Sequence, residues 1–155
     1  MKILGIDPGK ITGYAIVEYP EKKLLAFGFF KPDLVAETFY LTDQIERHRP
    51  DYLACEQPYA GININSYGKL QKHLGEIETL FKLYQPEGTI IGTSITRANR
   101  LMGLTSKPKK NEKCQAIQKL FSGYTELMTD DIASAIAATM VAYEMITGEK
   151  LDVSD

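Results

Sequence analysis

Short apolar runs near the start of the chain constrain its fold most strongly. Residues 2–7, 12–18 and 24–30 are rich in apolar, β-branched and aromatic residues, and short turns separate them. Runs of this length, bounded by glycine and proline, are typical of β-strands. A further apolar run, 51–56, lacks polar alternation, which predicts a strand that is buried on both faces inside a sheet. We therefore expect most of one sheet to form early in the chain.

Helical periodicity appears between and after these strands. It predicts helices over 33–48, 67–84, 112–121 and 130–147, and a fifth strand over 88–92. Residues 93–111 combine a short helix with a basic loop. The resulting order of elements predicts an α/β fold, in which helices cover both faces of a mixed five-stranded sheet.

The sequence also predicts the environments of several single residues in the helices. Asn111 and Thr129 stand where a side-chain cap would begin a helix. Leu34 and Phe39 are expected to face the core with the other apolar residues of their helix. We expect His73, like His48, to be an exposed helix residue.

Composition is consistent with one globular domain. The chain has 155 residues, of which 44% are hydrophobic, and we expect a single domain over 1–148 followed by a polar tail, 149–155. No apolar run is long enough to cross a bilayer, and the first residues lack a signal-peptide pattern. The sequence therefore predicts a cytoplasmic protein without a membrane partner. Two cysteines and two histidines argue against a disulfide scaffold and a zinc-finger-type site.

Carboxylates stand where the predicted elements meet. Asp7 and Glu56 each end an apolar strand, while Asp130 and Asp131 open an alanine-rich helix that can approach a sheet closely. A structural role is open for the aspartates, because they suit turns and first helical turns. Glu56 is harder to explain in this way, since burying an unpaired carboxylate is costly. If the three segments converge, their oxygen ligands predict a site for Mg²⁺, with Mn²⁺ able to substitute.

Such a site suits phosphodiester hydrolysis. Two divalent ions about 4 Å apart can activate water and stabilise the leaving oxygen, so that no serine or histidine nucleophile is needed. The formal net charge of −2 gives no hint of a polyanionic partner, but basic residues concentrate between residues 97 and 119. A solvated surface and a contact with DNA phosphates are both compatible with that segment. The candidate DNA-binding residues there are Arg97, Arg100, Lys107, Lys109 and Lys110.

Four short motifs follow one another in an order found in a known family. They are Ile3-Leu4-Gly5-Ile6-Asp7-Pro8-Gly9, Tyr52-Leu53-Ala54-Cys55-Glu56-Gln57, Glu112-Lys113-Cys114-Gln115 and Asp131-Ile132-Ala133-Ser134-Ala135-Ile136-Ala137. In this order they resemble the motifs of RuvC-type Holliday-junction resolvases. The resemblance implies a ribonuclease-H-like fold, a homodimer, and nicking of branched DNA, especially four-way junctions.

The resemblance also assigns roles to single residues. It implies catalytic metal ligands at Asp7, Glu56 and Asp131, a lysine that supports catalysis at Lys113, and an aromatic residue near the junction centre at Tyr59.

One position departs from the family pattern. The family usually carries a second aspartate in its last helix where this chain has Ser134. Asp130, four residues earlier, could supply the missing carboxylate as a metal ligand. Departures of this kind are typical of phage and other divergent members.

Three other functions stay open on the sequence alone. A related metal-dependent nuclease could act on other branched DNA, on single strands or on RNA hybrids. Ser134 raises the alternative of a module that binds DNA without cutting it. An actin-like ATPase also begins with a Gly-x-Asp-x-Gly loop, but its second lobe would need a longer chain.

Overall fold

A computed structural model describes residues 1–57, 64–121 and 129–151. Five strands within these residues form one mixed sheet in the order β3-β2-β1-β4-β5. β1 pairs antiparallel with β2 and parallel with β4, which continues parallel to β5. The interior position of β4 and the mixed sheet confirm the prediction. The strands are β1 (Lys2–Asp7), β2 (Thr12–Glu18), β3 (Lys23–Phe30), β4 (Tyr52–Glu56) and β5 (Thr89–Thr93).

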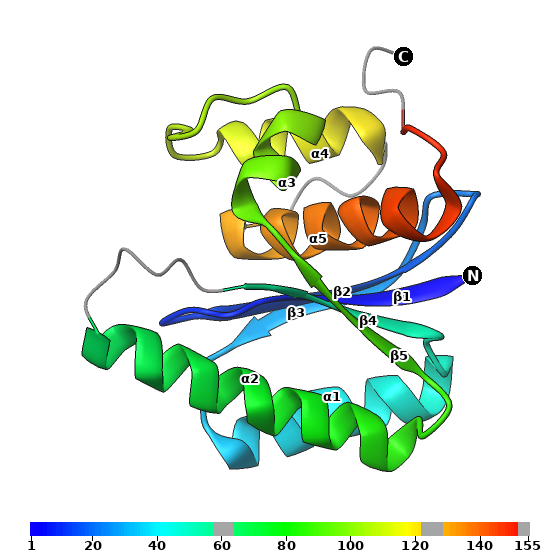
Figure 1. Cartoon of the computed structure of the whole chain (residues 1–155), viewed down its shortest axis with the longest axis vertical. Coiled ribbons are helices and arrows are strands. Elements are labelled where there is room, and N and C mark those ends of the chain that lie inside the picture. Colours follow the sequence, from blue (N-terminus) through cyan, green and yellow to red (C-terminus); the bar gives the residue numbers. More distant parts are fainter. Residues whose placement is uncertain (58–63, 122–128, 152–155) are drawn as a thin grey trace.

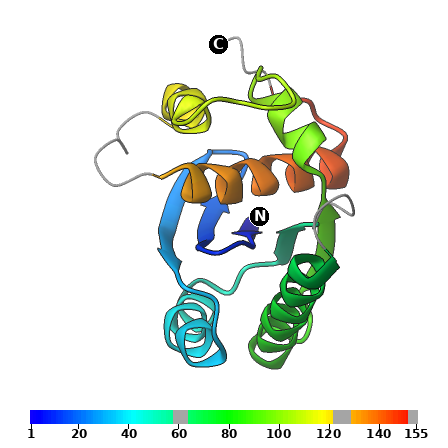
Figure 2. The same cartoon turned by 90° about the vertical axis from the view of Figure 1, so that its left-hand side faces the viewer.

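Helices cover both faces of this sheet, as predicted. α1 and α2 lie side by side on one face, α5 crosses the other, and α3 and α4 pack on the outer side of α5 (Figures 1 and 2). In the described ranges, every helix falls short of the length and apolar character needed to cross a bilayer. The helices are α1 (Leu34–His48), α2 (Ile64–Tyr84), α3 (Ile95–Leu101), α4 (Glu112–Leu120) and α5 (Asp130–Thr147).

The two predicted helix caps have different outcomes. The Thr129 side chain accepts a hydrogen bond from the Ile132 N–H at 3.3 Å, so its prediction is confirmed. Asn111 stands at the expected position but makes no side-chain cap, so that prediction is wrong. Its backbone is left-handed, with φ of 70°, whereas a capping side chain needs an extended backbone.

Three predicted side-chain environments are also wrong. Leu34 and Phe39 are 57% and 74% exposed. Leu34 shares a helix face with the buried Leu41, seven residues later, but it is the first residue of α1 and borders a surface groove. Phe39 is two residues from Leu41, about 200° around the helix. His73 is only 6% exposed, because it shares the buried stripe of α2 with Ile77, four residues later.

Strand alternation assigns the functional residues to faces of the sheet. Ile3 and Ala54 pack in the core cluster that contains α5, whereas the side chains next to them, Leu4 and Leu53, pack with α1 and α2. Side chains two residues apart on a strand share a face. Asp7 and Glu56 therefore project on the α5 side, at the ends of parallel strands.

Two glycines let α5 rest directly on the sheet. A Cβ atom at Gly5 would overlap the carbonyl oxygen of Ala135, and one at Gly13 would overlap the carbonyl oxygen of Asp131. Both obstacles are backbone atoms, which cannot swing aside as a side chain can. Gly13 also pairs with Asp7 across the β1–β2 ladder. This packing therefore holds the first turn of α5 beside Asp7.

We predict that Gly13→Ala destabilises the fold by about 1–3 kcal/mol or more, because an added methyl group must displace backbone. Urea unfolding measures the change. Gly68→Ala in α2 is the control, since a Cβ atom there meets nothing within 4 Å and alanine is favoured in helices. Equal stability of Gly13→Ala and wild type would contradict the close seating of α5 on β2.

Candidate active site

The two strand-end carboxylates meet at one edge of the sheet. Ile6 of β1 pairs with Cys55 of β4, so Asp7 and Glu56 follow side by side. A hydrogen bond joins their carboxyl groups. Glu56 is 6% exposed, which leaves it little contact with water. The structure thus brings together two of the predicted ligands.

α5 adds Asp131 to this pair, and α4 adds Lys113. Asp131 and Lys113 both lie close enough to Asp7 to influence it electrostatically. The Lys113 ammonium donates a hydrogen bond to the Ser134 hydroxyl at 3.0 Å. Four segments that are far apart in the sequence therefore supply three carboxylates and one ammonium group to one place. The convergence expected from the sequence is present.

Ser134 has a role that the sequence did not reveal. It is 3% exposed and lies one turn after Asp131 on α5, where it holds Lys113 toward the carboxylates. Two sequence features pointed to this contact: the motif that contains Lys113, and a small polar residue at the position where the family usually has an aspartate. Ser134 therefore positions the lysine and supplies no charge of its own.

Asp130 is turned toward α4. One carboxylate oxygen accepts a hydrogen bond from the Asn111 N–H at 2.9 Å, and the other accepts one from the Cys114 thiol at 3.1 Å. These contacts tie the start of α4 to the start of α5. Asp130 would have to give up at least part of this arrangement to bind a metal, so its role as a ligand stays a prediction.

The charge balance of the carboxylates depends on burial. Burial and the neighbouring Glu56 carboxyl raise the pKa of Asp7 to about 10, while Lys113 opposes the shift. Burial and the Asp130 carboxylate raise the pKa of Asp131, which Lys113 again opposes. One ammonium group therefore faces several carboxylates that are partly shielded from water. Oxygen donors in this arrangement fit a hard divalent cation, which would replace the protons.

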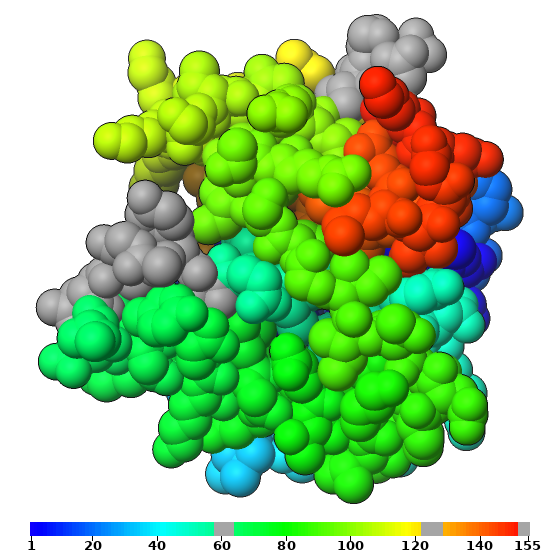
Figure 3. Space-filling model, in the orientation of Figure 1, coloured from blue at the N-terminus to red at the C-terminus, as the bar shows by residue number. Residues whose placement is uncertain are grey.

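A hollow opens on the surface beside the start of α5. In the space-filling view it lies between the loop after α3 and the N-terminal end of α2, and atoms from the start of α5 are visible inside it (Figure 3). The predicted DNA-binding residue Tyr59 lies outside the described residues. The basic candidates are all exposed, on α3 and on the loop that follows it: Arg97, Arg100, Lys107, Lys109 and Lys110.

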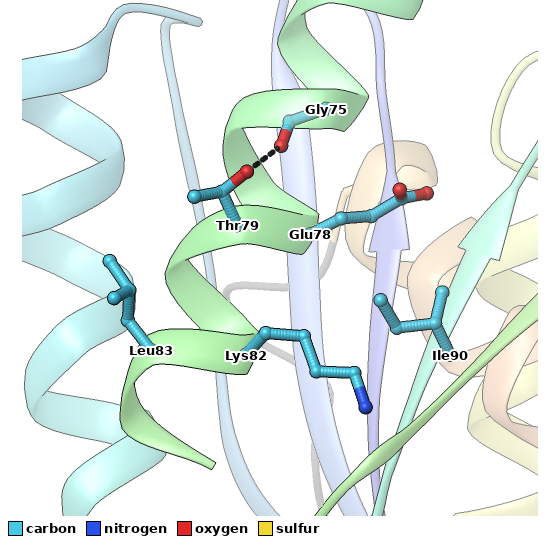
Figure 4. A pocket seen from close by; sticks show the side chains of 6 residues that line it. All are labelled: Gly75, Glu78, Thr79, Lys82, Leu83 and Ile90. Carbon is cyan, nitrogen blue, oxygen red and sulfur yellow. Dashed lines mark hydrogen bonds between the residues drawn. The ribbon is translucent and has the colours of Figure 1, made fainter. Parts of the chain in front are cut away.

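Another surface pocket lies away from the carboxylates, between α2 and β5. Figure 4 shows the Glu78 and Lys82 side chains extending from α2 toward Ile90, while Thr79 donates a hydrogen bond to the Gly75 carbonyl oxygen at 2.8 Å. The predicted catalytic residues do not line this pocket. Its lining residues are Gly75, Glu78, Thr79, Lys82, Leu83 and Ile90.

A buried cluster on the other face of the sheet was not expected from the sequence. Glu37 of α1 lies with His73 and Glu76 of α2. The sequence feature that could have predicted this cluster is the His-x-x-Glu spacing, which puts both α2 residues on one helix face.

The fold and sequence have known counterparts. No protein-family model matches the chain. The curated proteins named crossover junction endodeoxyribonuclease RuvC from Dehalococcoides mccartyi and Aliarcobacter butzleri are each 28% identical to it. The match covers 90% of this chain, and 90% and 96% of those proteins respectively. The chain is therefore similar in sequence, over most of its length, to proteins named RuvC.

The structural comparison extends this relationship to the fold. A Thermus thermophilus RuvC structure, described as a complex with Holliday junction substrate, superimposes with a TM-score of 0.77. The superposition covers 97% of this chain and 99% of that one at 16% sequence identity. The sheet and helices therefore form the ribonuclease-H-like fold of the RuvC family.

We predict that stability in the absence of metal falls as pH rises. The folded chain keeps a proton on Asp7 up to a pKa of about 10, whereas an unfolded aspartate releases it near pH 4. Over that window the folded state binds more protons, so the free energy of unfolding decreases with pH. Urea unfolding in EDTA between about pH 5 and pH 9 measures the slope.

Asp7→Asn should flatten this slope, because the amide has no proton to release. Asp43→Asn on α1 is the control, since Asp43 is exposed and forms an i,i+4 pair with Arg47. The same slope in Asp7→Asn and wild type would show that Asp7 is not the group responsible.

Proposed function

We propose that this chain is a divalent-metal-dependent, structure-selective endonuclease that nicks four-way DNA junctions. The observation that carries the proposal is the meeting of Asp7, Glu56 and Asp131 beside Lys113. The relatives named as crossover junction endodeoxyribonucleases support the same activity. Mg²⁺ is the proposed cofactor, with Mn²⁺ as a substitute, because the ligands are oxygens.

Each residue of the site has a proposed part in the cleavage. Asp7, Glu56 and Asp131 would hold the metal, which activates water and neutralises charge on the phosphate when bound. Lys113, held by Ser134, would face the charge that builds on the phosphate as the bond breaks. The hydrogen bond of Asp130 to α4 would keep that lysine in place.

Cleavage of a labelled synthetic four-way junction tests this function. We expect symmetric nicks with Mg²⁺ or Mn²⁺ that disappear with chelator, and loss of cutting in Asp7→Asn. Linear duplex, three-way junction, flap and hybrid substrates should be cut much less. Equal cutting of linear duplex would contradict junction selectivity and favour a less selective metal nuclease.

We predict that Lys113→Ala lowers the rate of nicking at saturating junction by about 10²–10³-fold, as expected for loss of one group that stabilises the transition state. Single-turnover kinetics measures the rate. Lys119→Ala is the control, because Lys119 is exposed at the other end of α4. If both variants cut equally fast, Lys113 does not touch the reacting phosphate.

Ser134 gives a specific reason to test a second function, a module that binds junctions without cutting them. Absence of nicking by wild type in both Mg²⁺ and Mn²⁺, with junction binding retained, would favour it. Ser134→Asp adds a carboxylate beside Lys113, and a gain of cutting in this variant would locate the defect at that position.

The exposed basic loop between α3 and α4 is the proposed DNA-binding surface, together with the two arginines of α3. It lies at the same end of the molecule as the start of α5 (Figure 1). Lysines on such a loop would bind phosphates without reading sequence.

We predict that replacing Lys107, Lys109 and Lys110 together with alanine reduces the salt dependence of junction binding. The slope of log affinity against log salt should shrink by about 0.9 for each phosphate that the variant no longer neutralises. Titrations at several salt concentrations measure it. The control is the double variant Lys2→Ala/Lys23→Ala, whose lysines lie at the opposite end of the sheet from Asp7. It should leave the salt slope unchanged. An equal reduction of the slope in the control and in the triple variant would argue against a specific DNA-binding surface.

We propose that the chain forms a homodimer, which would match the two-fold symmetry of a four-way junction. Exposed apolar side chains gather around the outer groove between α1 and α2. Leu34 and Leu83 border that groove and are 57% and 68% exposed, and Leu83 also borders the pocket in Figure 4. Leu80, by contrast, is buried.

Sedimentation equilibrium should give a mass of two chains for wild type. Leu83→Glu should shift the mass toward one chain, because a charge would be buried in the interface. Met145→Glu is the control, since Met145 is an exposed apolar residue on α5. A single-chain mass for wild type would contradict the dimer.

A further inference from the structure

A second group of metal-ligating side chains lies on the opposite face of the sheet from Asp7. Glu37 on α1 and His73 and Glu76 on α2 each offer one ligand atom, and these atoms lie within 4.8 Å of one another. Ligand atoms that share one ion at about 2.0–2.2 Å lie no more than about 4.4 Å apart. Small side-chain adjustments would therefore bring all three around a single ion.

Glu37 is not explained by ordinary helix packing. Its side chain is 0% exposed. Its carboxylate contacts the Nδ1 atom of His73 and lies against the carboxyl group of Glu76. Holding two carboxylates together out of water is costly, and a cation between these groups would offset that cost.

The orientation of His73 also suits a ligand. Its Nε2 atom lies 2.7 Å from the hydroxyl of Thr12, which is fully buried at the start of β2. When Nε2 donates its proton to Thr12, the Nδ1 lone pair points toward Glu37. Metal-bound histidines generally donate their second ring N–H to a polar partner in this way, which fixes the ring and its tautomer.

We propose that Glu37, His73 and Glu76 form a second metal site that takes a zinc-type divalent ion. One imidazole and two carboxylates favour Zn²⁺ over Mg²⁺, which prefers oxygen ligands alone. Glu76 is half-buried and borders the groove between α1 and α2. The ion would clamp α1 to α2 behind the sheet.

This site is separate from the proposed nuclease centre. Thr12 contacts α2, whereas the adjacent Gly13 contacts Asp131 of α5, so the two sites lie on opposite faces of β2. Zinc binding can therefore be tested in a variant that lacks two of the proposed nuclease ligands. The result does not depend on whether the chain is a nuclease.

The test uses the full chain with Asp7→Asn and Asp131→Asn, stripped of metal and titrated calorimetrically with Zn²⁺. We expect one Zn²⁺ per chain and much weaker binding of Mg²⁺. Adding Glu76→Gln should lower Zn²⁺ affinity at least tenfold, since even changes behind a ligand cost about 10–100-fold. Adding Glu78→Gln, a neighbouring acidic residue of α2 outside the cluster, should leave the affinity unchanged.

Two further measurements distinguish a ligand set from a structural contact. Thr12→Val keeps the shape of the side chain but removes its hydrogen bond to His73, and should weaken Zn²⁺ binding about 10–100-fold. Co²⁺ in place of Zn²⁺ should give visible absorption bands that His73→Gln removes. Absence of Zn²⁺ binding, or equal affinity with and without Glu76→Gln, would overturn the proposal.

Discussion

Close packing of the α5 backbone on β1 and β2 brings Asp131 to the two strand-end carboxylates of the candidate site. Gly5 and Gly13 leave room for carbonyl oxygens of α5 where any side chain would collide. The first turn of the helix is thereby fixed against the strand residue that pairs with Asp7. A helix held further from the sheet would carry Asp131 away from the strand-end carboxylates, and α3 and α4, which pack on α5, would move with it.

This arrangement holds carboxylates close together, and their mutual repulsion destabilises the fold. Two features of the chain reduce that repulsion. Lys113 places one positive charge near Asp7 and Asp131, and Ser134 fixes its position. Burial otherwise favours protons on these carboxyl groups. A divalent cation that displaced the protons would turn a destabilising cluster into a binding site. The cost of gathering these carboxylates and the proposed function therefore have one physical origin.

Local patterns predicted much of the fold. The strands and helices were predicted well because apolar periodicity depends on near neighbours, and α5 runs from Asp130 to Thr147 as predicted. The meeting of Asp7 and Glu56 was predictable, because neighbouring parallel strands end at one edge of a sheet. The approach of α5 was predictable from its small alanine side chains. Long-range contacts account for part of what the sequence did not predict: the buried His73 ring, for example, forms a hydrogen bond with Thr12, 61 residues away.

Anomalous X-ray scattering from a crystal soaked in Mn²⁺ would locate the ion among the side chains of the proposed nuclease centre. We predict Mn²⁺ bound by carboxylate oxygens of Asp7, Glu56 and Asp131 together, at the distances of about 2.0–2.2 Å expected for such ligands. Mn²⁺ bound without Asp131, or absent from these three residues at saturating concentration, would contradict a metal site shared by the two strands and α5.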